Sequence, residues 1–242
     1  MGSWRRHPWR GVVIATLLLA GSGACGQPGP GVPDSCQAPE GVNNNPATIA
    51  ETVDLINALR EAEGGVVTLP CFLQSLQRPL RMNGTTSRLS AQPATGAQNP
   101  RLFLLSQDMW LSVVPDGLGL PFLELGQPTE TNRSIKAEIE FPVHEPLTQA
   151  SPYERLASGN KVTTCGICHL DEKPALGIPN AMDSKTFRPA PKTVVPFDKI
   201  REEAAACDNV ATPERCEMFN ALFKHGKVEA APFPTDMPTI FQ

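Results

Sequence analysis

The five residues Cys165-Gly166-Ile167-Cys168-His169 constrain this 242-residue chain more than any other feature of its sequence. Two cysteines stand three positions apart, and a histidine follows the second one directly. Three kinds of site use cysteines at this spacing: a zinc site, a dithiol redox centre, and the covalent attachment site of a c-type haem. Each of them requires a different surrounding structure, so the remainder of the sequence has to distinguish between them.

The zinc and dithiol interpretations lack the surroundings that each requires. A structural zinc site needs a second pair of ligands at similar spacing, whereas Cys207, Cys216 and His225 follow one another at intervals of nine residues. A thioredoxin-like dithiol begins a helix in a strand–helix–strand unit, but a polar loop precedes Cys165 and no parallel-sheet pattern surrounds it. Both alternatives stay open and rank below haem attachment.

The first 24 residues have the pattern of a secretory signal peptide. Three arginines and no acid precede an apolar run over residues 11–24, which is too short for a membrane-spanning helix and ends in small residues. The following Cys25 resembles the lipidated cysteine of bacterial lipoproteins. That resemblance, with Gly26 in the next position, implies an outer-membrane lipoprotein that faces the periplasm. Ordinary cleavage after Ala24 is the alternative.

The charge of the exported chain excludes one class of partner. Removal of the signal takes away three arginines and no acid, so the formal net charge changes from −4 to −7. Nucleic-acid binding favours clusters of Lys and Arg, and no run of five or six basic residues occurs here. We therefore expect no nucleic-acid partner. The 25 prolines predict long connections and little helix.

Export also permits disulfides, and the seven cysteines divide accordingly. Four remain when Cys25 and the two motif cysteines are set aside, and four cysteines allow three pairings. We favour Cys36–Cys71 and Cys207–Cys216, because the members of each pair are nearest in sequence and lie in the same segment.

The N-terminal half predicts a tether followed by one helix. Residues 25–46 are rich in Pro, Gly and Asn, which is typical of a linker. Asn45 is a candidate helix cap and Pro46 suits the first helical turn. Apolar residues then recur at helical spacing until Gly64 ends the pattern. We expect one amphipathic helix that packs on the segments after it.

Several short strands are predicted between residues 65 and 145. Residues 65–76 are rich in β-forming side chains, and Asn83-Gly84 and Asp116-Gly117 have the composition of turns. Trp110 is interpreted as a buried aromatic rather than as part of a binding face. Residues 47–145 thus predict a small β-rich domain, sandwich- or barrel-like, without a catalytic constellation. Its last strand shows four apolar residues that alternate with charged ones: Ile135, Ala137, Ile139 and Phe141.

From residue 146 the composition changes to loops with two helices. The helices are expected within residues 196–209 and 212–226, with Thr212 as the cap of the second and Gly226 as its stop. We expect a mainly α, loop-rich domain over residues 146–242, and an α+β fold class for the chain.

The Cys-x-x-Cys-His sequence of an exported chain resembles the attachment site of the monohaem c-type cytochromes. The resemblance implies that Cys165 and Cys168 form the thioether bonds to one covalent haem c, and that His169 is the proximal ligand of its iron. It also implies that residues 146–242 are cytochrome-c-like.

The same resemblance implies a second iron ligand on the opposite side of the haem. Met237 lies in a proline-flanked loop that resembles the methionine loop of this family, and Met is a usual partner of the proximal His. Three other residues compete for the position: His225, Met182 and Met218.

These expectations favour a lipid-anchored electron carrier of the cell envelope, which passes single electrons between redox partner proteins, over an enzyme. Two alternatives from other classes remain. With an open sixth site, the haem would serve a sensor or a peroxidase-like enzyme. If the β-rich domain carried the function, the protein would be an envelope binding or scaffold module.

Overall fold

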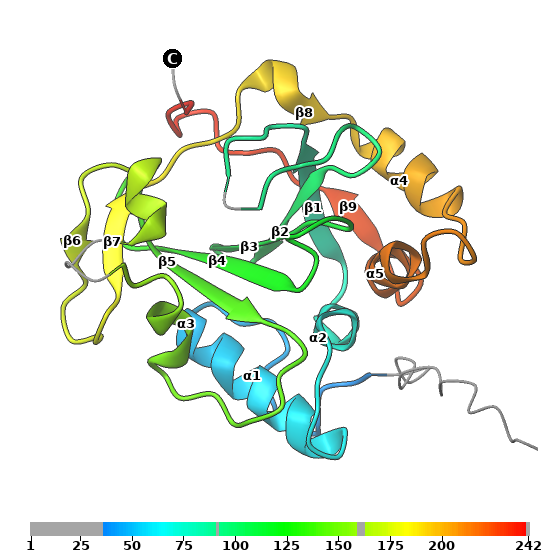
Figure 1. Ribbon diagram of the computed structural model, residues 1–242, viewed down its shortest axis with the longest axis horizontal. Helices are drawn as coiled ribbons and strands as arrows, with labels where there is room; N and C mark the ends of the chain where they lie inside the picture. Colours follow the sequence, from blue (N-terminus) through cyan, green and yellow to red (C-terminus); the bar gives the residue numbers. More distant parts are fainter. Residues whose placement is uncertain (1–35, 91, 159–162, 241–242) are drawn as a thin grey trace, which may run out of the picture. The chain divides into compact units, whose positions relative to one another are not determined.

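One sheet organises the part of the chain that the structure describes (Figure 1). The computed structural model describes residues 36–90, 92–158 and 163–240, and nine strands within them form this sheet. Its order is β6-β7-β5-β4-β3-β2-β1, and β8 and β9 both pair with β1. All pairs are antiparallel except β1 with β9. The strands are β1 (Leu80–Thr85), β2 (Arg101–Ser106), β3 (Met109–Val113), β4 (Phe122–Pro128), β5 (Arg133–Glu140), β6 (Lys173–Pro174), β7 (Met182–Lys185), β8 (Val194–Val195) and β9 (Val228–Ala230).

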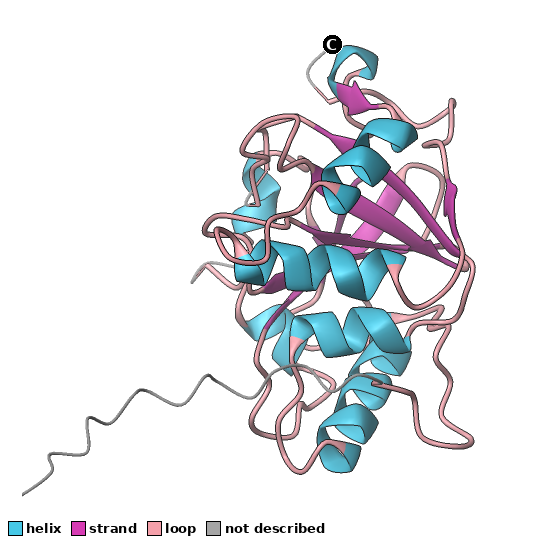
Figure 2. Cartoon of the chain, turned by 90° about the vertical axis from the view of Figure 1, so that its right-hand side faces the viewer, coloured by secondary structure: helices cyan, strands magenta, loops and turns pink. Residues whose placement is uncertain are grey.

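Helices gather beside this sheet, as the side view in Figure 2 shows. In Figure 1, α1 and α2 lie together along one face of the strands. The helices are α1 (Ile49–Ala62), α2 (Leu69–Ser75), α3 (Ser151–Glu154), α4 (Phe197–Ala205) and α5 (Pro213–Phe223), with the 3-10 helices η1 (Thr164–Ile167) and η2 (Pro191–Thr193).

The hydrophobic core lies between one face of the sheet and the helices α1, α2 and α5. The alternation predicted for the last strand is confirmed by β5, whose Ile135, Ala137 and Ile139 are buried. The apolar face predicted for the first helix is confirmed by α1. Because side chains alternate along a strand, the opposite face of β2–β5 carries a different set of residues, and these build the candidate site described below.

The expected fold class is wrong, because the described part of residues 146–242 does not form a mainly α, cytochrome-c-like domain. Four strands from this segment, β6 to β9, extend the same sheet that β1–β5 begin, so no separate sandwich or barrel forms either. The two predicted helices are present as α4 and α5. The four strands are two to four residues long, which is too short for a periodic sequence signal.

Two helix starts differ from the prediction. The first helix is capped by Thr48 instead of Asn45, and the Thr48 hydroxyl accepts a hydrogen bond from the Glu51 N–H (3.1 Å). The β-like residues 65–76 contain α2, whose cap is Thr68 and whose first turn contains a proline. Capping and this proline outweigh a β propensity that depends strongly on context.

The predicted turn at Asn83-Gly84 is also wrong, since both residues lie inside β1. A Cβ on Gly84 would come within 2.8 Å of Cδ1 of Ile200, so the glycine permits α4 to approach the strand closely. The turn predicted at Asp116-Gly117 is confirmed between β3 and β4.

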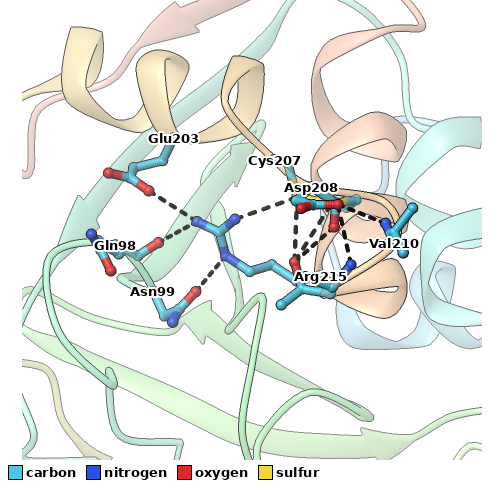
Figure 3. Close-up of a disulfide and its surroundings, with 10 residues drawn as sticks. Gln98, Asn99, Glu203, Cys207, Asp208, Val210 and Arg215 are labelled. Atoms are coloured by element: carbon cyan, nitrogen blue, oxygen red, sulfur yellow. Dashed lines mark hydrogen bonds and ion pairs between the residues drawn. A yellow bond between two sulfur atoms is a disulfide. The ribbon is translucent and has the colours of Figure 1, made fainter.

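Both predicted disulfides are confirmed. Cys36–Cys71 and Cys207–Cys216 have Cα–Cα distances of 5.2 and 5.5 Å. Figure 3 shows the second of them beside Arg215. The Arg215 guanidinium donates hydrogen bonds to Asn99 Oδ1 (2.6 Å) and to the Gln98 carbonyl (2.8 Å), and pairs with Glu203 on α4 (3.0 Å). The disulfide and this arginine together fix α5 against α4.

The predicted signal peptide and the lipidation site Cys25 lie outside the described residues, as does the first part of the predicted tether. Among the residues that the structure describes, no helix is both long enough and apolar enough to cross a bilayer.

Removal of the two disulfides is expected to have unequal effects. Cys36–Cys71 closes a sequence separation of 35 residues and Cys207–Cys216 one of nine, so their loss should lower the free energy of unfolding by about 4 and about 2.5 kcal/mol. Urea titration of the two double-alanine variants measures the difference. Equal midpoints in urea would contradict the expected order.

Candidate functional site

The motif forms a short 3-10 turn that Glu172 holds in place. Cys165 lies in η1, and the Thr163 hydroxyl accepts a hydrogen bond from its N–H (3.2 Å). The Glu172 carboxylate in turn accepts hydrogen bonds from the N–H (2.7 Å) and the hydroxyl of Thr163. A Cβ on Gly166 would lie 2.6 Å from Oε2 of Glu172. The glycine inside the motif therefore gives this carboxylate the space it occupies.

The His169 ring is oriented by the backbone of β7. Its Nδ1 lies 2.9 Å from the carbonyl oxygen of Lys185. A carbonyl only accepts hydrogen bonds, so the proton resides on Nδ1 and the Nε2 lone pair is available to a ligand. The ring also stacks on Phe187 with 6.0 Å between centroids. Burial, with the nearby charge of Lys136, lowers the pKa of His169 to about 4, so the imidazole is neutral at pH 7.

A cavity of about 150 Å³, here called the sheet cavity, lies on the sheet face opposite the core. Side chains from β2 to β5 line one side of it, and residues that follow β7 and β9 line the other. The ring centroid of Phe233 lies 5.0 Å from that of Phe103 and 5.1 Å from that of Trp110. Trp110 is therefore a wall of this cavity, and its interpretation as a merely buried aromatic was wrong.

Met237 and His169 both line the sheet cavity. The Met237 loop is attached to the chain next to Phe187: the Arg188 N–H donates to the Pro238 carbonyl (2.9 Å), and the Ile240 N–H donates to the Arg188 carbonyl (3.1 Å). Met237 thus reaches the cavity from a loop that is tied to the segment whose Phe187 stacks on His169.

The other three candidates for the sixth ligand lie elsewhere. His225 is exposed beyond the end of α5, while Met182 in β7 and Met218 in α5 are buried. None of the three lines the sheet cavity. Met237 is the one candidate that shares this cavity with His169.

The two motif cysteines are free thiols. Burial raises the pKa of the Cys165 thiol to about 12, so it is not a thiolate at neutral pH. Among the described residues, the one group of three metal donors within 4.8 Å of one another is Cys36, Glu63 and Cys71, whose cysteines form a disulfide. The motif side chains do not converge on a single metal ion, and a reactive dithiol is equally unsupported.

Charged side chains also line the cavity, and sequence reasoning missed them. Arg101 forms an ion pair with Glu124, and its guanidinium donates to Ser112 (2.7 Å). The Lys136 ammonium donates hydrogen bonds to two hydroxyls, those of Ser134 and Thr186 (3.4 Å for the latter). Burial lowers the pKa of Lys136 to about 8.

A sequence signal for Lys136 existed. The alternation of residues 134–143 places Lys136 on the polar face of its strand. What the alternation cannot reveal is that later segments cover that face. His169 follows Lys136 by 33 positions and Met237 by 101, and no local pattern predicts that they meet.

No protein-family model, curated protein or solved structure matches this chain.

Glu172→Ala is expected to loosen the motif without unfolding the protein. Loss of the two hydrogen bonds to Thr163 should speed modification of Cys165 and Cys168 by a thiol reagent roughly thirtyfold, since each such bond contributes on the order of 1 kcal/mol. Glu202→Ala, which removes an exposed carboxylate on α4, is the control. An unchanged rate would show that Glu172 does not hold the turn.

Lys136→Met is expected to raise stability at pH 7. With a pKa of about 8 in the folded protein and 10.5 as its ordinary value, Lys136 binds its proton more weakly when folded, so wild-type stability rises with pH between these values. The variant should gain about 2 to 3 kcal/mol below pH 8, and the gain should disappear near pH 10.5.

Urea titrations of wild type and Lys136→Met across that pH range measure the gain. Lys199→Met, at an exposed lysine on α4, should change stability by less than about 0.5 kcal/mol and serves as the matched control. A gain that is independent of pH would contradict the explanation.

Proposed function

We propose that this chain is an exported haem protein that carries one c-type haem and transfers single electrons. Cys165 and Cys168 would form the thioether bonds, and His169 and Met237 would be the two axial ligands of the iron. The iron supplies the chemistry, a change of one unit between its ferrous and ferric states, with the electron taken from one redox partner and given to another.

The observation that carries the proposal is the hydrogen bond between His169 and the Lys185 carbonyl. A ligating histidine typically donates its second ring N–H to an oxygen acceptor, which fixes its tautomer and orientation. Here Nδ1 donates across 2.9 Å, and Nε2 is left as the donor atom for iron. The ring is thus prepared for ligation by the fold itself.

Two of the proposed haem-binding residues line the sheet cavity, whereas Cys165 and Cys168 do not line it. An imidazole and a thioether line one cavity, and they are the axial pair typical of electron-carrying c-type haem. Four aromatic side chains line the cavity beside its polar and charged ones: Phe103, Trp110, Phe187 and Phe233. Apolar walls limit the access of water and favour the reduced, less charged state of the iron.

The proposed haem site lies on one face of a β-sheet and not in the mainly α domain predicted from the sequence. In place of a mainly α domain, β2–β5 supply one wall of the cavity, and the motif turn and the Met237 loop belong to segments that cover it. Fold alone does not decide function, so the proposal depends on the site residues and not on likeness to a cytochrome fold.

The anchoring of the Met237 loop favours electron transfer over the haem enzyme with an open sixth position. Two backbone hydrogen bonds attach this loop to Arg188. Held in this way, Met237 would remain bound to the iron, and such a site would exchange electrons instead of binding a substrate.

Met237→Leu is expected to open the sixth position while it preserves apolar volume. In protein made with haem-attachment machinery, the wild-type spectrum should be low-spin in both oxidation states. Met237→Leu should become high-spin when oxidised and bind carbon monoxide when reduced. Absorption spectra of both forms measure the change.

Met182→Leu is the matched control, because Met182 is buried in β7 away from the sheet cavity. It should keep the wild-type spectrum. A low-spin spectrum in Met237→Leu would rule out Met237 as the ligand, and a high-spin wild type would favour an enzyme or sensor.

A further inference from the structure

We infer that Lys136 forms a carboxylate-binding subsite in the sheet cavity, which takes a propionate group of the bound haem. The inference rests on the proposed haem function and assigns a role to a residue that neither the motif nor the axial ligands use. Lys136 would then determine which edge of the macrocycle enters the cavity.

The Lys136 ammonium has no anionic partner. Its hydrogen-bond partners are the hydroxyls of Ser134 and Thr186, and none of the described carboxylates forms an ion pair with it. All three side chains line the sheet cavity. A cationic donor flanked by two hydroxyls offers a set of hydrogen-bonding groups that suits the two oxygens of a carboxylate.

The other cations that line the cavity already have carboxylate partners. Arg101 pairs with Glu124 and is held further by Ser112, so its charge is compensated. Arg133 likewise pairs with Asp171 and Asp183. Lys136 is the cavity-lining cation without an ion pair among the described residues, and Asp183 and Glu124 attract it only from a longer distance. An anion bound in the cavity would be its first direct charged partner.

A partly buried charge without an ion-pair partner lowers the stability of the fold, so stability does not explain the presence of Lys136. Removing a cation from water without an opposite charge destabilises a fold, and a methionine of similar length would pack at this place without that cost. Residues that lower stability in this way are concentrated at binding sites. A carboxylate that enters the cavity and forms a charge-assisted hydrogen bond with Lys136 would offset this loss of stability.

Reversible binding of two haem forms tests the subsite. In a chain with Cys165→Ser and Cys168→Ser, iron protoporphyrin IX and its dimethyl ester differ only in their carboxylates. Wild-type Lys136 should favour the free acid by roughly ten- to hundredfold in dissociation constant, as expected for a charge-assisted hydrogen bond. Lys136→Met should lose most of this preference, and Lys136→Arg should retain it.

Lys199→Met, which removes an exposed lysine from α4, is the matched control and should leave the preference unchanged. Equal binding of acid and ester by the chain with Lys136 intact would overturn the subsite, as would a preference that survives Lys136→Met. These results leave the haem proposal standing, because in each case haem is bound.

The failure of the proposed function has a different signature. If neither haem form binds the serine variant and the unaltered chain retains no haem, both proposals fall. If the serine variant binds neither haem form but the unaltered chain retains haem, the subsite is tested on chains that carry covalent haem. The measurement is then the midpoint reduction potential of wild type and of Lys136→Met. Loss of the cation should lower the potential, because a nearby positive charge favours reduced iron, and an unchanged potential would overturn the subsite.

Discussion

The guanidinium of Arg133 connects the three segments on which the candidate site depends. Arg133 is the first residue of β5. Its guanidinium donates hydrogen bonds to the carboxylate and the carbonyl of Asp183 in β7 (2.7 and 3.0 Å). It also donates to the carboxylate and the carbonyl of Asp171, two residues after His169 (3.0 and 2.9 Å). One side chain thereby fixes the motif segment and the strand whose Lys185 carbonyl orients the histidine. These hydrogen bonds hold the His169 ring in position relative to the Lys185 carbonyl that accepts its hydrogen bond.

The geometry of the site then follows from the two unlike faces of one sheet. The core face is apolar and packs on helices, so it provides a stable base. The other face carries Phe103, Trp110 and Lys136, and segments far along the chain close over it. The proposed haem site depends on local features, namely a turn, an oriented imidazole and a methionine that lines the same cavity, and not on a helical cytochrome fold.

The sequence predicted some of this arrangement well. The disulfide pairs, the alternating strand β5 and the helices α4 and α5 all have local signals: nearest-neighbour spacing, period-two alternation, and caps with proline. The motif and Met237 could also be selected from the sequence, and His169 and Met237 do line one cavity.

The failures share one physical cause, which is that tertiary contacts override local preference. Gly84 has the signature of a turn, but it is required by the close approach of Ile200. Strands such as β6 and β8 have only two residues each and exist because a neighbour offers a free edge. Lys136 has an ordinary place in an alternating pattern, and only the covering segments make it a buried cation. None of these features is encoded in a window of sequence.

The central claim is that Cys165 and Cys168 hold a haem covalently, and the mass of the denatured protein tests it most directly. The chain should be produced in a host that attaches c-type haem, then unfolded and measured beside the Cys165→Ser, Cys168→Ser variant. The wild-type chain should carry the added mass of one haem after denaturation, and the variant should carry none. A wild-type mass equal to that of the polypeptide alone would contradict it.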